Sequence, residues 1–302
     1  DHRDLHLMLR RQRQMCIRDR GSRALYNNTT GESNTAVGHN SLDANTTGSD
    51  NVAVGRDALG ANTTASNNTS VGNYSMLLST TGGENAAFGA HTLKNNTDGE
   101  YNTALGTHAL RNATTADNNT AVGVSAMYTN TTGVANVAVG NETLYTNTTG
   151  YNSVAIGRKA LYLNTTGHTN NAGGWGALYN NTTGVYNTAW GFKALYSNVG
   201  NSYNTAIGHQ ALYSNTTGGE RNTAVGYEAL YSNTTGYYNT AVGMNAVKTN
   251  VGGHYNVGVG YNALTVNSSG GNNTAVGYKT LQSNTTGSEQ TAVGTGALSA
   301  ST

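Results

Sequence analysis

The sequence predicts an all-β protein, a parallel β-solenoid (also called a β-roll) of about 17 stacked coils of 17 residues each. Three observations lead to this prediction. A phrase close to Asn-Thr-Ala-Val-Gly recurs at a fixed interval, apolar residues keep their place in every copy, and turn-forming residues separate the copies. One copy is too short to bury its own apolar side chains, so neighbouring copies must supply the core.

The repeat is defined by the glycine that closes each phrase, which we number position 0. From Gly21 to Gly294 these glycines are 17 residues apart, except for one interval of 18 residues between Gly208 and Gly226. Such a unit is too short for two helices and their turns but long enough for short strands joined by turns. Residues 21–302 therefore form one repeat domain. Because the repeat is cut at both ends, we expect a fragment of a longer protein.

The strand lies just before position 0, where residue types alternate with the period of two that is typical of strands. Positions −3 and −1 share a face and carry mostly β-branched residues. Position +4 is Leu, Met or Val in every copy. We therefore predict that positions −1 and +4 form the core ladders: Val37, Val54, Val122, Val139, Ile156, Ile207, Val225, Val242, Leu161, Leu178, Leu195, Leu212 and Leu230.

Asparagine occupies position −4 in 14 of 16 copies, and it is also frequent at position +7, where Thr-Thr-Gly follows it. Asn-Thr-Thr-Gly is typical of turns, because Asn tolerates left-handed backbone and Gly has no steric penalty. Stacked coils place each asparagine above the next, as in cross-β ladders. The predicted Asn ladder comprises Asn34, Asn51, Asn102, Asn187, Asn204, Asn222 and Asn239.

Small residues at positions −2 and +3 alternate with the large ones, and two explanations remain open. The first is that the coil interior or a strand corner is too crowded for larger side chains. The second is that solenoids pack side by side against this face. The absence of proline from the chain agrees with strands paired on both sides.

Tyrosine fills position +5 in seven consecutive copies, on the face opposite to Leu at +4. These residues form a surface stripe that either stabilises the sheet by stacking or binds sugars, a partner fibre or a surface: Tyr128, Tyr145, Tyr162, Tyr179, Tyr196, Tyr213 and Tyr231.

Composition excludes several classes of function. Charged residues are only 10% of the chain. Residues 1–20 form a basic, non-repeat segment that we interpret as an artefact or a disordered arm. Residues 21–302 hold 10 basic and 12 acidic residues, so nucleic-acid binding has no electrostatic support. No apolar stretch is long enough to insert into a membrane, and the single Cys16 cannot form an internal disulfide.

No pattern indicates an enzyme. Carboxylates are sparse, and there is no nucleophile motif and no phosphate-binding loop. The eight histidines make no column and have no cysteine partners. We therefore expect no catalytic residues, no metal and no cofactor.

The phrase "NSVAIGRKA" at residues 152–160 resembles the SVAIG motif of the YadA-like heads of trimeric autotransporter adhesins, and "NTAVG…AL…NTTG" resembles repeats of bacterial and phage fibre proteins. The resemblance covers residues 21–302, although coils in that family are a few residues shorter. It implies a left-handed roll, a homotrimer, display on a cell surface or virion, and a role in cell adhesion and virulence. It also implies that Val154 and Ile156 point into the coil core and that Gly157 makes the turn.

The sequence thus favours a structural, extracellular fibre segment, an adhesin head or a phage tail-fibre shaft, whose partners are copies of itself and a host surface protein or glycan. The alternative is an ice-binding β-solenoid that uses arrays of Thr at positions −3, +8 and +9. Against this alternative, position −3 shares its parity with the expected core, and +8 and +9 lie in a turn.

Overall fold

The computed structural model describes residues 18–300. They belong to two compact units, which divide the chain after Ala135 and hold residues 18–135 and 136–300 of the described part. Each unit is a parallel β-solenoid with one three-residue strand per repeat, joined to the next strand by turns. The predicted all-β solenoid is confirmed. Residues 18–300 contain no helix and carry 17 strands, one in each repeat, along about 15 turns of the solenoid. Residues 1–17, with Cys16, lie outside the described residues.

Unit 1 contains seven strands: β1 (Arg18–Arg20), β2 (Thr35–Val37), β3 (Val52–Val54), β4 (Thr69–Val71), β5 (Ala86–Phe88), β6 (Thr103–Leu105) and β7 (Thr120–Val122). Unit 2 contains the other ten: β8 (Val137–Val139), β9 (Val154–Ile156), β10 (Asn171–Gly173), β11 (Thr188–Trp190), β12 (Thr205–Ile207), β13 (Thr223–Val225), β14 (Thr240–Val242), β15 (Val257–Val259), β16 (Thr274–Val276) and β17 (Thr291–Val293).

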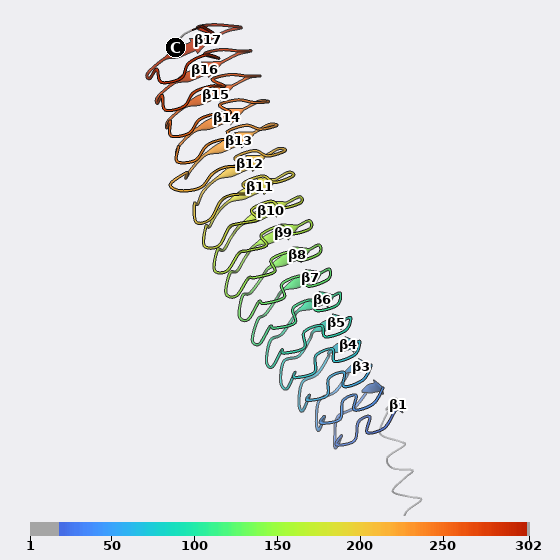
Figure 1. Cartoon of the computed structure of the whole chain (residues 1–302). Coiled ribbons are helices and arrows are strands. Elements are labelled where there is room, and N and C mark those ends of the chain that lie inside the picture. Colours follow the sequence, from blue (N-terminus) through green and yellow to red (C-terminus); the bar gives the residue numbers. More distant parts are fainter. Residues whose placement is uncertain (1–17, 301–302) are drawn as a thin grey trace, which may run out of the picture. The chain divides into compact units, whose positions relative to one another are not determined.

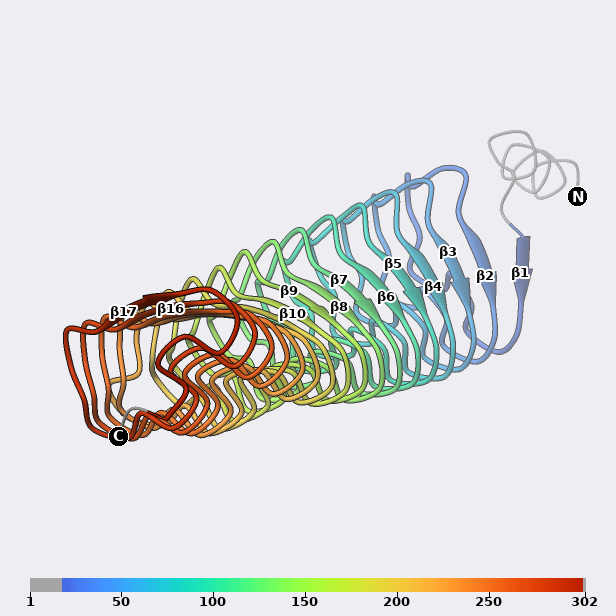
Figure 2. The same cartoon turned by 90° about the horizontal axis from the view of Figure 1, so that it is seen from above.

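Within each unit every strand pairs in parallel with the strand of the next repeat, and equivalent residues face each other. In unit 2, for example, Thr188 pairs with Thr205, and Ala189 pairs with Ala206. The strands therefore follow one another along one wall of the coils, which both views show (Figures 1 and 2). This pairing places every repeat position directly over its equivalent in the next coil.

Main-chain hydrogen bonds also join the turns of successive coils. The amide of Leu195 donates to Ala211 O at 3.0 Å, and that of Lys193 donates to Trp175 O at 2.9 Å. Because the bonds lie both on and off the strands, each coil is bonded to its neighbours around much of its circumference.

The interior of the coil differs from the expectation at position −1. The core valines and isoleucines that we predicted there point outward, half-exposed or exposed: Val37, Val54, Val122, Val139, Ile156, Ile207, Val225 and Val242. The alanine at position −2 is buried instead, as in Ala206 and Ala224. The orientation that the resemblance implied for Val154 and Ile156 is also wrong, whereas Gly157 does make the turn, with φ 119°.

The leucines at position +4 do lie in the core. Leu161, Leu178, Leu195, Leu212 and Leu230 are each fully buried. Gly258 shows what they face: a Cβ added there would meet Val247 Cγ2 and, at 3.8 Å, Leu264 Cβ. Position −2 therefore packs against position +4, and the space between the two walls admits only a methyl group. This crowding explains the column of small residues.

Alternation by parity fails around position +4 because the backbone there is left-handed. Leu195 has φ 51°, and Lys193 two residues earlier has φ 53°. A left-handed residue reverses the alternation of side chains, so that Ala194 and Leu195 are both buried. Such a conformation costs roughly 1–2 kcal/mol for a residue with a side chain, which burial of the leucine offsets.

The Asn ladder at position −4 is buried and bonds mainly to the main chain. Asn51 N donates to Asn34 Oδ1 at 3.0 Å, and Asn34 Nδ2 donates to Gly48 O at 2.7 Å. The same amide-to-Oδ1 bond links Asn187, Asn204, Asn222 and Asn239 in turn, and it links Asn85 to Asn102. Each asparagine side chain thereby supplies hydrogen-bond partners to main-chain amide and carbonyl groups of the turns, which have no partner in a strand. Side-chain amides of this ladder also bond to each other, since Asn51 Nδ2 donates to Asn34 Oδ1 at 3.1 Å.

A second ladder, at position +7, also links side-chain amides to each other, and most of these bonds are shorter than in the −4 ladder. Asn181 Nδ2 donates to Asn164 Oδ1, and Asn198 Nδ2 donates to Asn181 Oδ1, both at 2.9 Å. Ser79 interrupts this ladder in unit 1 and leaves the buried Oδ1 of Asn62 without a donor.

Two irregular segments keep the strand register. The 18-residue copy takes up its extra residue in the turn at Gly218, with φ 76°, and Thr205 still pairs with Thr223. Arg18–Arg20, which we assigned to the non-repeat segment, form β1 and pair with β2. Main-chain pairing does not require the repeat's side chains. Separately, no helix within residues 18–300 is long and apolar enough to cross a membrane.

We expect Leu230→Ala to lower the free energy of unfolding by about 2–5 kcal/mol, because it leaves a cavity. Ala241→Val should cost about 1–3 kcal/mol by overpacking. Thr240→Val is the control, since its side chain points outward and other copies carry Val there. Urea unfolding followed by circular dichroism measures all three. Equal costs for Ala241→Val and Thr240→Val would contradict the assignment of the interior.

Ser79→Asn should stabilise unit 1 by about 1 kcal/mol, because the new amide supplies a donor to Asn62 Oδ1 and completes the ladder. The matched variant in unit 2, Asn198→Ser, removes such a bond and should destabilise by a similar amount or more. The midpoints of urea unfolding compare the two. A loss of stability in Ser79→Asn would show that position +7 in that coil has no room for an amide.

Candidate functional site

The outward side chains at positions −3 and −1 of β8–β17 form one continuous surface of unit 2, which we call the strand face. Position −3 carries Thr, Val or Asn, and position −1 carries Val, Ile, Trp or Gly, so the face holds no charged side chain. Ile156 is 40% exposed and Ile207 is 43% exposed. Contiguous apolar surface of this kind marks interaction sites in soluble proteins.

Aromatic residues at position +1 extend this surface beyond the strand ends. Trp175, Phe192, His209 and Tyr227 come from four successive coils and stack at centroid distances of 5.0–5.1 Å. Only the glycine at position 0 separates this column from position −1. Because of this glycine, the coil turns away and leaves apolar side chains exposed on both sides of the bend.

One place interrupts the strand face. β10 carries Asn171 and Gly173 at its outward positions, and β11 carries Trp190, which is 43% exposed. A Cβ added to Gly173 would collide with the indole ring of Trp190, so this ring lies over the glycine and buries it. The indole ring of Trp190 therefore occupies the space that a side chain at Gly173 would fill.

The predicted Tyr stripe is a stacked column in unit 2. Tyr145, Tyr162, Tyr179, Tyr196, Tyr213 and Tyr231 are half-buried, with successive centroids 5.1–5.3 Å apart and ring planes within 18° of parallel. Burial raises the pKa of Tyr196 above its ordinary value, and the neighbouring Tyr179 and Tyr213 raise it further. Tyr128 belongs to unit 1, where it meets His108 edge-on at 6.0 Å.

Stacking decides what this column does. A sugar ring binds to an aromatic face, but neighbours cover both faces of Tyr162, Tyr179, Tyr196 and Tyr213. The geometry therefore favours stabilisation over a sugar-binding platform. Lys193 joins this column to the column at +1: its Nζ lies 5.1 Å from the ring centre of Tyr196 and 5.2 Å from that of Trp175. Cation–π attraction thus ties neighbouring parts of the turn together.

A third column of rings follows position −5 in unit 2. Tyr186 stacks on Tyr203 at 5.2 Å, and Tyr238 stacks on Tyr255 at 5.3 Å. Between these pairs the guanidinium of Arg221 lies 5.1 Å from the ring centre of Tyr203 and 5.4 Å from that of Tyr238. The planar cation takes the place of a ring and keeps the column continuous.

Unit 1 has a shorter stack of Tyr74, His91 and His108, with centroids 5.2 and 5.3 Å apart. Burial lowers the pKa of both histidines, and the nearby cationic groups Lys94 and Arg111 lower it further; for His91, the neighbouring His108 also contributes. The environment of the stack therefore favours the neutral form of both imidazoles.

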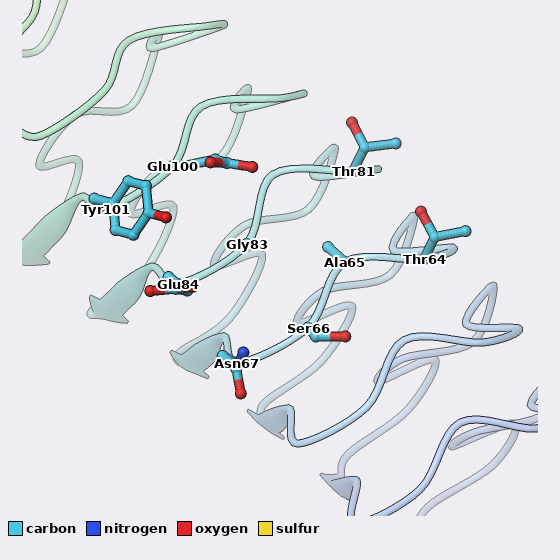
Figure 3. A pocket seen from close by; sticks show the side chains of 9 residues that line it. All are labelled: Thr64, Ala65, Ser66, Asn67, Thr81, Gly83, Glu84, Glu100 and Tyr101. Atoms are coloured by element: carbon cyan, nitrogen blue, oxygen red, sulfur yellow. The ribbon is translucent and has the colours of Figure 1, made fainter.

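Unit 1 also has a shallow polar hollow of about 250 Å³ on the turns before β4, β5 and β6. Thr64, Ser66, Thr81, Glu84 and Glu100 line it together with main chain and the ring of Tyr101 (Figure 3). The two carboxylates come from successive coils. Among residues 18–300, no group of three or more His, Cys, Asp or Glu side chains could hold a metal ion.

The Asn-x-Thr turns have a structural explanation. Asn164, Asn181 and Asn233 are fully buried, and the Nδ2 of each donates to the carbonyl three residues ahead. The nitrogen that a glycan would modify is therefore engaged inside the coil.

The columns at +1 and −5 do not stand out in the sequence, because their residue types vary along the chain. A scan for any aromatic or cationic residue at these positions, instead of for one residue type, would have found them. Comparison of the chain with known protein families and with curated proteins gives no match.

Tyr179→Leu should lower the free energy of unfolding by about 1–2 kcal/mol, because it removes two ring–ring contacts. Tyr179→Phe keeps both rings in place and should be close to neutral. Urea unfolding compares the two variants. Equal stability of the Leu and Phe variants would show that stacking does not stabilise the coil.

Unit 1 should lose stability as the pH falls below about 6.5, the ordinary histidine value. The pKa of His91 and that of His108 are lower in the folded chain, so the unfolded chain binds more protons below that pH. The part of the free energy of unfolding that depends on neutral histidines is fully present above pH 6.5 and is lost on acidification. Hydrogen exchange of unit 1 at pH 7.5 and 5.5, corrected for intrinsic rates, measures it. The variant His91→Gln/His108→Gln should lack most of the change; an equal change in this variant would assign the effect to other groups.

Proposed function

We propose that this chain is a segment of a non-catalytic extracellular fibre, the head of an adhesin or the shaft of a phage tail fibre, in which copies associate side by side through the strand face. The strand face is the observation that carries the proposal. It is uncharged, it carries Val or Ile at position −1 in most coils and Thr or Val at position −3, and its side chains recur at the spacing of paired strands.

A second copy of the chain fits this face by its spacing. Neighbouring strands lie about 4.8 Å apart, and another copy carries Val and Ile at the same interval. Burying the exposed part of one such side chain contributes at most about 1 kcal/mol. Several coils together can offset the several kcal/mol that association costs. No like charges oppose each other across the contact.

The coil architecture supports a mechanical role. Main-chain bonds connect each coil to the next, two buried asparagine ladders link most of the coils, and the columns of rings add contacts on the outside. A segment built in this way resists local opening, because one coil cannot separate without breaking bonds to both neighbours. Such stiffness suits a spacer that presents a binding end or a repetitive side.

The resemblance to YadA-like heads adds the finer parts of the proposal: three copies per assembly, a left-handed coil, and a host surface protein or glycan as the target. Because the valines at position −1 point outward, they are available for contacts between copies. Inward-pointing valines would not be.

Multi-angle light scattering of the purified chain tests the proposal, and we expect the mass of a trimer. Val242→Glu should weaken association at least about 100-fold, because it buries an unpaired charge. Thr235→Glu, on an exposed turn, is the control and should not change the mass. A monomeric parent chain would contradict the proposal.

Ice binding is the second candidate, and one observation favours it more than the sequence did. Thr188, Thr205, Thr223 and Thr240 point outward from paired parallel strands, in register. The objection that position −3 belongs to the core therefore fails. A thermal hysteresis measurement separates the candidates: ice shaping by the chain, abolished by Thr223→Glu, would put ice binding first.

A further inference from the structure

Identical coils raise a problem of alignment for the side-by-side association proposed above. Except at Gly173 and Trp190, position −1 of unit 2 is Val or Ile in every copy: Val139, Ile156, Ile207, Val225, Val242, Val259, Val276 and Val293. Two such faces fit almost equally well after a shift of one whole coil. The repeat alone does not fix which coil of one chain lies against which coil of the next.

The one irregular place in this column offers an answer. Trp190 is far larger than Val, and its indole ring extends over Gly173 instead of standing beside the next coil. Asn171, next to Gly173 on β10, replaces the usual Thr or Val as well. The outward surface of β10 and β11 therefore has a shape and polarity that no other pair of coils in unit 2 repeats.

We propose that Trp190 and Gly173 set the register between copies of this chain, which run parallel with Trp190 of each copy at the same level. This inference rests on the proposed association through the strand face. The partner is a second copy, because only another copy carries the same spacing and the same irregular level.

Packing makes the aligned register the favoured one. When copies are aligned, the indole rings meet at one level, where large aromatic side chains pair well, and every other level meets its own equivalent, including Phe88 and Leu105 in unit 1. A shift of one coil places Trp190 of one copy against Ile207 of the other, and Trp190 of the other copy against Gly173, which the indole of its own chain already covers. Two levels are then overpacked or poorly filled instead of one, and dense interfaces tolerate this poorly.

Cysteine crosslinking tests the register in the full chain with Cys16→Ser as background. Val242→Cys chains reveal same-level contacts by crosslinking to each other. A mixture of Val242→Cys chains with tagged Val225→Cys chains reveals contacts shifted by one coil, because these residues pair across β13 and β14. We expect same-level crosslinks to exceed shifted ones by about tenfold or more.

The matched variant is Gly173→Val/Trp190→Val, which restores the usual residue at both positions and should fold like its neighbours; circular dichroism checks this. In this variant we expect the excess of same-level over shifted crosslinks to fall several-fold, with an unchanged oligomer mass. Phe88 and Leu105 still distinguish the levels of unit 1. A same-level preference as strong as that of the parent chain, or equal crosslinks in the parent chain, would overturn the register proposal while leaving association intact. A monomeric parent chain would overturn both.

Discussion

The stacking of each coil on an equivalent coil is the constraint on which the rest of the structure depends. Main-chain bonds join Leu195 to Ala211 and Thr188 to Asn204, and parallel pairing keeps every position above its equivalent. A residue therefore meets its own kind above and below. This condition selects residue types that interact well with themselves: amides that both donate and accept, aromatic rings that stack, and glycines where the backbone passes close to itself. Gly191 is an example, since a Cβ there would collide with Gly208 O.

The same constraint divides the side chains into a narrow interior and a varied exterior. Inside, Leu at +4 faces Ala at −2, and buried asparagines close both sides of the turn. The pair of Gly258 and Val247 shows how small the space is, because the loss of one methyl group accompanies a change in the opposite side chain. Outside, the residues at +1, +5 and −5 change along the chain, and each column combines rings with cations such as Lys193 and Arg221. Stability comes from the interior and from these columns, whereas the uncharged strand face remains available for another surface.

The repeat period, the short strand before each glycine and the buried leucines could be predicted from the sequence, because period and turn chemistry are local properties. The phase of the strand could not. Thr-Ala-Val alternates in either sense, and we chose the larger residue for the core, although the interior accepts only the smaller one. The faces of the residues around position +4 could not be predicted either. Leu195 has a left-handed backbone, so the alternation of side chains counted from the strand does not continue through it. The stacking of the tyrosines could be proposed from their spacing, but the coverage of both ring faces required coordinates.

The single long copy has a consequence for how such chains vary. Its additional residue is accommodated where Gly218 bulges from the turn, while Thr205 and Thr223 remain opposite each other. The outer bend is thus decoupled from the bonded wall. Length can change there without disturbing the layers on either side, so foreign peptides inserted at this bend would be carried at a defined height on an otherwise unaltered scaffold.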